Sequence, residues 1–288
     1  MKFVITGDIS TWNIKDFNIE KFNPDILNIL KSSDAVIYNL EGPIGDKSFG
    51  NSVFSENRIT DIFLKGLNAF INKEQPLVFS DIKILDLLKA NPNTIATMAN
   101  NHIKDLGLEG YLNTVKILEE NNIKYVGGEE KGKDNSRIDI GNISVFNFNF
   151  IGKKYIFNLY GSSKQTFGAS NASFDTIHER ILKAKEENKK TVLILHIGKE
   201  MVEDIKKWDV ELEEIKKLNA DITVIHHPHT YIKTEYEKDN IFVLGDFLFY
   251  RPEKFDINRQ TAILEIQEER EQLNCRIREF LVSEIYRY

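Results

Sequence analysis

Three histidines follow a short apolar run, ITVI, at residues 222–225. His226, His227 and His229 lie within four positions and make up half of the six histidines in the chain. On an extended strand, His227 and His229 would project from the same face, so that one strand end supplies two imidazole ligands. His226 would project from the opposite face, where we expect a supporting residue rather than a ligand. The spacing therefore favours a metal site at the end of this strand.

Polar side chains also follow the other apolar runs that we interpret as strands. Taken singly, each is typical of a turn, a helix cap or a buried structural histidine. Ligands of open α/β sheets bind outside the carboxyl ends of the strands, so we expect these side chains to converge. In chain order they are Asp8, Asn39, Glu41, Asn100, Asn101, His102, His196 and Asp246.

The chemistry of this set is that of a divalent metal. Carboxylate, amide and imidazole groups without sulfur suit Mn, Fe, Zn or Ni. The single cysteine, Cys275, excludes an intrachain disulfide and a thiolate-rich zinc site. The set predicts one or two ions. Two ions about 3.5 to 4 Å apart, bridged by one carboxylate, form the clamp that activates water in phosphoester displacement.

The elements that must position these residues alternate between short apolar runs and helical periods, which is the pattern of an α/β layer fold. Residues 137–150 predict a β-hairpin around Gly141 and Asn142, and residues 261–267 and 276–286 predict paired strands. The remaining predicted strands are 2–6, 35–40, 94–98, 191–195, 222–225 and 241–244. The predicted helices are 80–91, with Ser80 as its cap, 110–122, 173–190 and 208–220.

Composition and charge exclude some classes of partner. The chain has 38 basic and 44 acidic residues and a formal charge of -6, with no Arg-rich stripe, so nucleic acid is not an expected partner. The N-terminal apolar run is too short for a secretory signal, and no 18 apolar residues run together, so we expect a cytoplasmic protein without direct membrane insertion. No linker or repeat divides residues 1–288, which predicts a single domain. Residues 45–75 are polar and form an expected excursion over the active face.

Five segments of the chain carry a family resemblance. They are TGDIS at 6–10, YNLEGPI at 38–44, MANNHIKDLGLEGYLNTVKILEENNIKYVGG at 98–128, LHIGKE at 195–200 and HHPHTYIKTEYEKDNIFVLGDFLF at 226–249. In this order they resemble the CapA-type capsule biosynthesis proteins, implicated in poly-gamma-glutamate capsule synthesis and distantly related to the calcineurin-like metallophosphoesterases. The resemblance implies a four-layer α-β-β-α sandwich with the active site at the carboxyl ends of the strands.

The resemblance also implies roles for individual residues. Asp8 would bind one metal, Glu41 would bridge two, and Asn101 would be the amide ligand beside the catalytic general acid His102. His196 and His227 would complete one metal site, whereas His229 would join Asp8 and Glu41 at the other. Asn39, Asn100, His226 and Asp246 would support these ligands or contact substrate. Glu200 and Glu235 match acidic positions of the capsule-type proteins and would be ligands or substrate contacts.

The chain departs from the phosphoesterase pattern at three places and from the capsule-type pattern at one. The first strand has Asp8-Ile9-Ser10 in place of Asp-x-His, so one metal site lacks an imidazole. Glu41 replaces the bridging aspartate, and His226 replaces the glycine before the His-x-His pair. Gly245-Asp246 stands where capsule-type proteins commonly have Gly-Asn. These departures leave open whether the first site is weak, mononuclear or empty.

Two functions remain open from the sequence. The first is a metal-dependent hydrolase of cell-surface polymer metabolism that acts on a phosphoester or an amide bond of an anionic polymer or small molecule. The second is a non-catalytic accessory protein of a capsule-synthesis complex, which keeps the pocket to hold an anionic chain. The missing first-strand imidazole favours the second reading.

Overall fold

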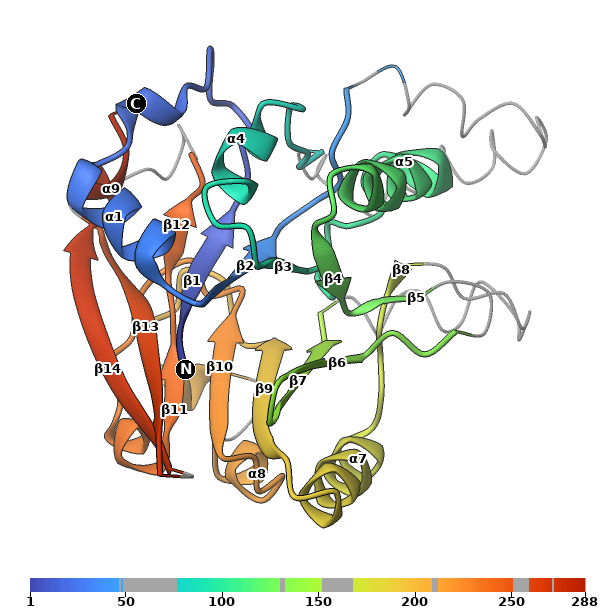
Figure 1. Ribbon diagram of the computed structural model, residues 1–288, viewed down its shortest axis with the longest axis vertical. Helices are drawn as coiled ribbons and strands as arrows, with labels where there is room; N and C mark the ends of the chain where they lie inside the picture. The colour runs from blue at the N-terminus through green and yellow to red at the C-terminus, as the bar shows by residue number, and fades with distance from the viewer. Residues whose placement is uncertain are drawn as a thin grey trace.

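The computed structural model describes residues 1–46, 48, 77–129, 133–151, 168–208, 212–250, 259–270 and 272–287. Most of the predicted excursion at 45–75 lies outside these residues. The described part contains two larger β-sheets, and helices lie on both sides of the pair (Figure 1). No helix among the described residues is long and apolar enough to cross a lipid bilayer.

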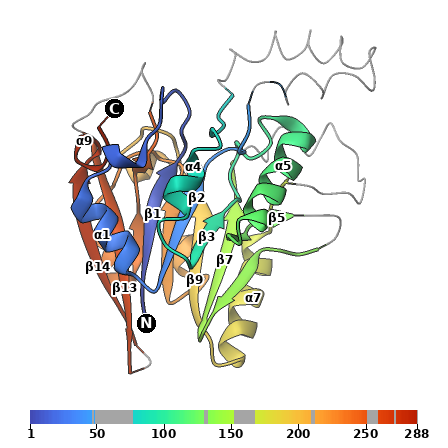
Figure 2. The same ribbon diagram turned by 45° about the horizontal axis from the view of Figure 1, so that its top comes forward.

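The first sheet has β1 (Lys2–Ile9) near its centre. Its order is β14-β13-β1-β2-β3-β4, and β12 also pairs with β1. β1, β2, β3 and β4 are parallel, whereas β13 runs antiparallel to both β1 and β14. Figure 2 shows β1, β2 and β3 side by side. The other strands are β2 (Ala35–Leu40), β3 (Thr94–Thr97), β4 (Lys124–Val126), β12 (Asp246–Leu248), β13 (Gln260–Glu269) and β14 (Gln272–Leu281).

The second sheet has the order β11-β10-β9-β7-β6. β7, β9, β10 and β11 are parallel, and β6 pairs antiparallel with β7 as the predicted hairpin. These strands are β6 (Arg137–Ile140), β7 (Ile143–Asn149), β9 (Lys190–His196), β10 (Ile222–His226) and β11 (Ile241–Val243). A separate short ribbon pairs β5 (Gly128–Glu129) with β8 (Gly168–Ala169).

Apolar side chains form three clusters, which define four layers. Ile5, Ile37 and Leu264 of the first sheet pack against Val192 and Ile194 of the second, so the central cluster lies between the sheets. The other two clusters join each sheet to its own helices, seen on opposite sides of the strands in Figure 1. The helices are α1 (Pro24–Ser32), α4 (Ile84–Leu88), α5 (Gly107–Glu120) and α9 (Val282–Ile285) on the first sheet, and α7 (Phe174–Glu186) and α8 (Leu212–Lys216) on the second.

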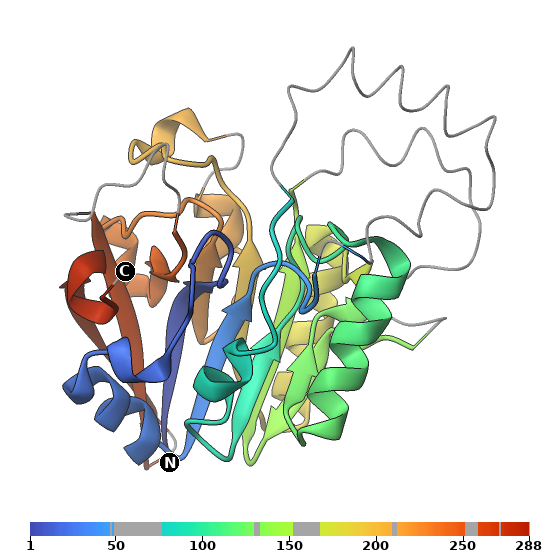
Figure 3. The same ribbon diagram turned by 90° about the horizontal axis from the view of Figure 1, so that it is seen from above.

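This arrangement confirms the predicted α-β-β-α sandwich. The strands between the layers are buried on both faces, which explains why they read as continuous apolar runs rather than as alternating patterns. Figure 3, seen from above, shows α1, α4 and α5 in front of the first sheet. Two helices begin at side-chain caps, because Asn23 accepts from the Asp25 amide and Ser173 from the Thr176 amide.

Several predicted boundaries were wrong. The helix predicted at 80–91 is shortened to α4, because Ser80 forms a β-bridge with Ile44 and accepts a hydrogen bond from the Thr11 amide instead of capping a helix. The last strand ends at Leu281, after which α9 buries Val282 and Ile285. The helix predicted at 208–220 keeps only α8 among its described residues, and α1 and β12 were not predicted.

Candidate metal centre

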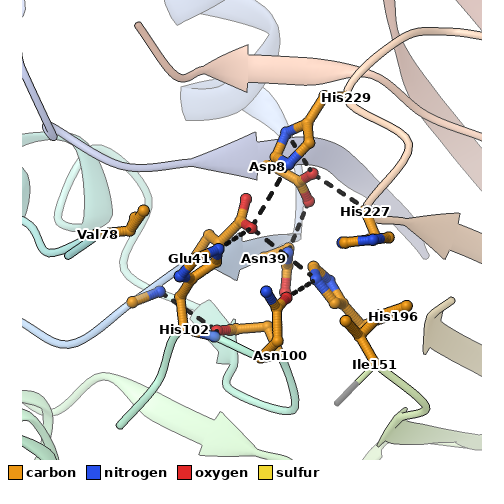
Figure 4. A network of polar contacts seen from close by, with 12 residues as sticks. Asp8, Asn39, Glu41, Val78, Asn100, His102, Ile151, His196, His227 and His229 are labelled. Carbon is orange, nitrogen blue, oxygen red and sulfur yellow. Dashed lines mark hydrogen bonds and ion pairs between the residues drawn. The ribbon is translucent and has the colours of Figure 1, made fainter. Parts of the chain in front are cut away.

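The carboxyl ends of four strands meet at one edge of the sandwich. In the first sheet, Asp8 is in register with Asn39 of β2 and with Asp246 of β12. In the second sheet, His226 is in register with His196. The convergence expected from the sequence therefore occurs, and Figure 4 shows the side chains of Asp8, Glu41, His102, His196, His227 and His229 gathered in one place.

Gly7 allows β12 to approach β1 this closely. The amide of Asp8 donates to the carbonyl of Gly245 at 3.2 Å. A Cβ atom at Gly7 would lie 1.7 Å from that same carbonyl oxygen, so any side chain there would push the two strands apart. The Gly-Asp pair that reads as a simple turn in the sequence is thus a close backbone contact that brings Asp8 beside Asp246.

Glu41 lies at the centre of the cluster and is fully buried. Its Oε1 is 3.9 Å from Nε2 of His102, 3.9 Å from Nε2 of His196 and 3.7 Å from Nε2 of His229. These separations are too long for hydrogen bonds. They match donors that share an ion, because ligands held about 2.0 to 2.2 Å from one metal lie roughly 3 to 4 Å from each other.

Asp8 forms the second acidic point of the cluster. Its Oδ1 accepts a hydrogen bond from Nδ2 of Asn39 at 2.6 Å, and Asn39 in turn accepts from the Thr97 hydroxyl at 3.2 Å. Its Oδ2 accepts from the His227 amide at 3.4 Å and lies 3.5 Å from Nδ1 of His229. Asn39 therefore orients the Asp8 carboxylate, and Oδ2 faces the histidines.

The HHPH segment is not an extended strand. β10 ends at His226, and His227 and His229 have φ angles of 93° and 59°, in the left-handed region. The prediction that strand alternation puts both rings on one face was therefore wrong, although the loop does bring them to the cluster. The His227 ring centroid is 5.0 Å from that of His196 and 6.0 Å from that of His229. His226 is fully buried, and its Nε2 bonds to the carbonyl of Thr6 at 2.9 Å.

The Asn100-Asn101-His102 turn contributes three different functions. Asn100 holds the turn, because its Oδ1 accepts from the His102 amide at 3.1 Å and its Nδ2 donates to the Leu40 carbonyl at 2.8 Å. Asn101 Oδ1 contacts Nε2 of His196 at 2.7 Å. His102 Nδ1 contacts Oδ2 of Asp105 at 2.7 Å, so its Nε2 faces Glu41. Asp105 was missed in the sequence, although an acidic residue three positions after a candidate histidine could have indicated it.

A second buried group surrounds Asp246. Its Oδ1 is 2.6 Å from Nδ1 of His229, and its Oδ2 pairs with the guanidinium of Arg259. Asp8, His229 and Asp246 together place ligand atoms within 4.8 Å of one another. Sequence reasoning named Asp246 as a support for the ligands or a substrate contact, and it missed Arg259, which lies outside every recognised motif.

Two other positions singled out in the sequence, Ser10 and Glu200, lie in loops beside the cluster. Ser10 accepts from the Trp12 amide at 3.1 Å and contacts the Ser80 hydroxyl at 3.3 Å, so its side chain stabilises a loop rather than the cluster. Glu200 is half-buried in the turn beside the HHPH loop, where Met201 donates to Pro228.

The expectation that Glu235 is a ligand or substrate contact was wrong. After the HHPH loop the chain runs back along β11, and the antiparallel bridge between Ile232 and Val243 marks this return. Glu235 is exposed and opens the 3-10 helix η3 (Glu235–Asp239), which directly precedes the amino end of β11. It therefore lies at the end of the sheet opposite the cluster.

The protonation of His196 and His227 suits metal binding. Burial lowers the pKa of His227 to about 3 and that of His196 well below its usual value, so both rings are neutral, as ligation requires. Burial also opposes a charge on His229, yet Asp246, Glu41 and Asp8 raise its pKa to about 10. Burial raises the pKa of the Asp8 carboxyl. A cluster of this kind holds buried acids and imidazoles that a cation would stabilise.

Buried nitrogen atoms give a further test of whether these residues fit a metal. Within the described part of the chain, Nδ1 of His196 and Nδ1 of His227 are buried and have no hydrogen-bond partner. The spacing around Glu41 and the contact between Asn101 and His196 bring carboxylate, imidazole and amide donors together without sulfur. The residues present therefore fit a divalent transition metal.

Solved structures resemble this fold. A calcineurin-like phosphoesterase from Bacillus subtilis, YfkN, superposes with a TM-score of 0.52 at 14% identity, over 98% of this chain and 91% of that one. At such low identity the likeness shows the fold alone, which is metallophosphoesterase-like.

Curated relatives and a family profile extend the comparison to sequence. The capsule biosynthesis protein CapA of Bacillus anthracis is 29% identical over 164 residues, which is 54% of this chain and 40% of that protein. The PGA biosynthesis protein CapA of Bacillus subtilis (strain 168) is 25% identical over 231 residues, which is 77% of this chain and 54% of that protein. The chain thus spans about half the length of these relatives or less. Because the profile described as bacterial capsule synthesis protein PGA_cap matches residues 3–251, the chain belongs to this capsule synthesis family.

Proposed function

We propose that this protein is a metal-dependent hydrolase of cell-surface polymer metabolism that cleaves a phosphoester or an amide bond. One observation carries the proposal: the buried Glu41 carboxylate lies 3.7 to 3.9 Å from the Nε2 atoms of three histidines at the carboxyl edge of both sheets. A carboxylate buried beside these rings costs folding free energy unless a cation is bound, so its presence favours a catalytic ion at this position. The relatives named for capsule and PGA biosynthesis support an anionic polymer as the substrate class.

Two sets of residues would hold one or two divalent ions. Glu41, Asn101, His196 and His227 form one set, and Asp8, Glu41 and His229 form the other. When bound, such an ion supplies Lewis acidity and lowers the pKa of water at the site, so no serine or cysteine nucleophile is needed. Asn39 and Asn100 keep these ligands in place through their hydrogen bonds to Asp8 and to the Leu40 carbonyl.

His102 would carry the proton of the leaving group. An ionised carboxylate can only accept hydrogen bonds, so Asp105 accepts one from Nδ1 of His102 and stabilises the protonated ring. The opposite nitrogen, Nε2, faces the cluster 3.9 Å from Glu41. His102 is 9% exposed, at the boundary between the cluster and solvent. This position suits a general acid that donates to a leaving oxygen or nitrogen and recovers its proton from water.

The experiment compares two single histidine substitutions in the full chain. His227→Ala removes a proposed ligand, whereas His178→Ala, on α7, removes a histidine whose ring contacts the Leu218 carbonyl away from the cluster. Metal-loaded protein is assayed on a panel of phosphomonoesters, phosphodiesters and γ-glutamyl amides. We expect metal-dependent turnover of one class that falls at least about 100-fold in His227→Ala and is retained in His178→Ala. Failure of metal-loaded wild type on every class would refute the hydrolase.

A non-catalytic binding protein of a capsule-synthesis complex is the second candidate function. The observation that favours it is the position of Ser10, whose side chain stabilises a loop where the phosphoesterase pattern has a ligand histidine. This function predicts that metal-free protein retains an anionic polymer such as poly-γ-glutamate in a pull-down, with no change in polymer length. Polymer shortening that requires metal would exclude it.

A further inference from the structure

Arg259 is a buried positive charge beside the proposed metal centre. Its side chain is 6% exposed, and its guanidinium pairs with Oδ2 of the fully buried Asp246. A second contact, 3.5 Å from Nη1 to the sulfur of Met201, holds it against the turn beside the HHPH loop. Within the described residues its Nε has no hydrogen-bond partner, so Asp246 is the group that compensates its charge.

Both oxygens of Asp246 are therefore engaged. Oδ2 binds Arg259, and Oδ1 lies 2.6 Å from Nδ1 of His229. The group of Asp8, His229 and Asp246 has the composition and the spacing of a cation site, but one of its carboxylates is already neutralised by a guanidinium. The other ring nitrogen of His229, Nε2, faces Glu41 at 3.7 Å. A histidine held by a carboxylate through one nitrogen commonly ligates a metal through the other.

The net charge of the buried cluster also limits how many divalent ions it can bind. The buried cluster contains three carboxylates, Asp8, Glu41 and Asp246, and one guanidinium, Arg259. When the carboxylates are ionised and His229 is neutral, as a metal ligand must be, their charges and that of Arg259 leave a net charge of about minus two, which one divalent ion neutralises. A second divalent ion would leave a net charge of about plus two in a site with almost no solvent, and uncompensated buried charge is strongly unfavourable.

We infer that Arg259 takes the place of a second metal, so that the centre binds one divalent ion, at Glu41, the carboxylate that both proposed ligand sets share. The inference rests on the metal centre of the proposed function and specifies its stoichiometry. Gly245-Asp246 and Arg259 then form a matched pair: the carboxylate orients His229, and the guanidinium prevents that carboxylate from attracting another cation.

The test counts metal ions in intact protein. Wild type, Arg259→Met and Arg259→Lys are loaded with excess Mn²⁺, desalted and analysed by elemental analysis and native mass spectrometry. We expect one equivalent in wild type, two in Arg259→Met, which keeps most of the side-chain volume without the charge, and one in Arg259→Lys, which keeps the charge. Circular dichroism verifies that each variant is folded.

A measurement on wild type alone keeps the inference testable if Arg259→Met does not fold. The electron paramagnetic resonance spectrum of the Mn²⁺-loaded protein should show the six lines of an isolated ion rather than the multiline pattern of a coupled pair. Two equivalents in wild type, with a coupled spectrum, would overturn the inference and leave the proposed hydrolase standing. A folded Arg259→Met variant that still binds one ion would also overturn it. Wild type that binds no ion under any loading would refute both the inference and the metal-dependent function.

Discussion

Glu41→Gln is the substitution that most directly tests the centre, because it removes one charge at nearly constant volume. At an effective dielectric constant of about 20, a unit positive charge 3.7 Å from Oε1, the distance to His229 Nε2, is attracted by about 4 kcal/mol, which is a lower bound for a divalent ion bound to that oxygen. Loss of this attraction raises the dissociation constant of the ion by about 10³-fold, since each 1.4 kcal/mol corresponds to a factor of about ten. The glutamine amide keeps the packing but not the attraction.

The assay is thermal unfolding with and without metal. If wild type binds Mn²⁺ with a dissociation constant of about 1 μM, then 1 mM metal stabilises it by about 4 kcal/mol, whereas Glu41→Gln gains only about 0.4 kcal/mol. For a chain of 288 residues the entropy of unfolding is about 0.6 kcal/mol/K, so the expected Tm shifts are about 7 °C and less than 1 °C.

A matched control removes the same charge from the surface. Glu120→Gln alters an exposed glutamate on α5 whose nearest partner is Lys116 at 3.8 Å. This variant should keep the full metal-induced shift in Tm. Equal shifts in wild type and Glu41→Gln would refute the assignment of Glu41 as a ligand, whatever the activity of either protein.

Other substitutions and probes test the surroundings of the centre. Asp105→Asn weakens the group that orients His102, so turnover should fall by about 10- to 100-fold while the metal content measured by elemental analysis stays constant. Gly7→Ala introduces a Cβ 1.7 Å from the Gly245 carbonyl, so urea unfolding should show a loss of about 3 kcal/mol or more and weaker metal binding. Burial raises the pKa of Cys275 to about 12, so its alkylation at pH 8 should be at least about 100-fold slower than in the urea-unfolded chain and should accelerate as the pH rises.

Each of these three predictions has a result that would contradict it. Unchanged turnover in Asp105→Asn would remove the proton-transfer role of His102. A Gly7→Ala variant with the wild-type urea midpoint would show that β1 and β12 separate without cost. Equal alkylation rates of Cys275 in folded and unfolded protein at pH 8 would place that thiol in solvent.

The strands and their polar ends could be predicted because both depend on local sequence. Buried parallel strands read as unbroken β-branched and aliphatic runs, and β2 begins and ends where the run Ala35–Leu40 does. The side chains just beyond these runs are limited to one edge of the sheets, so Asp8, Glu41 and His196 could be assigned to a common site from chain order. Helix ends were less predictable, because Ser80 has the composition of a cap but pairs with Ile44 instead.

The tertiary structure decided which of these groups touch and with what consequence. Asp105 lies within the segment 98–128, but its contact with His102 appears only in the structure, whereas Arg259 lies outside every motif and reaches Asp246 across 13 positions of sequence. His227 and His229 meet the cluster through left-handed backbone rather than through strand alternation. Glu235, close to them in sequence, is carried to the far end of the sheet. Periodicity and composition determine which residues lie at a strand end. Strand register and the paths of the loops determine the distances between these residues, and the distances set the charge and the number of ions that the centre can hold.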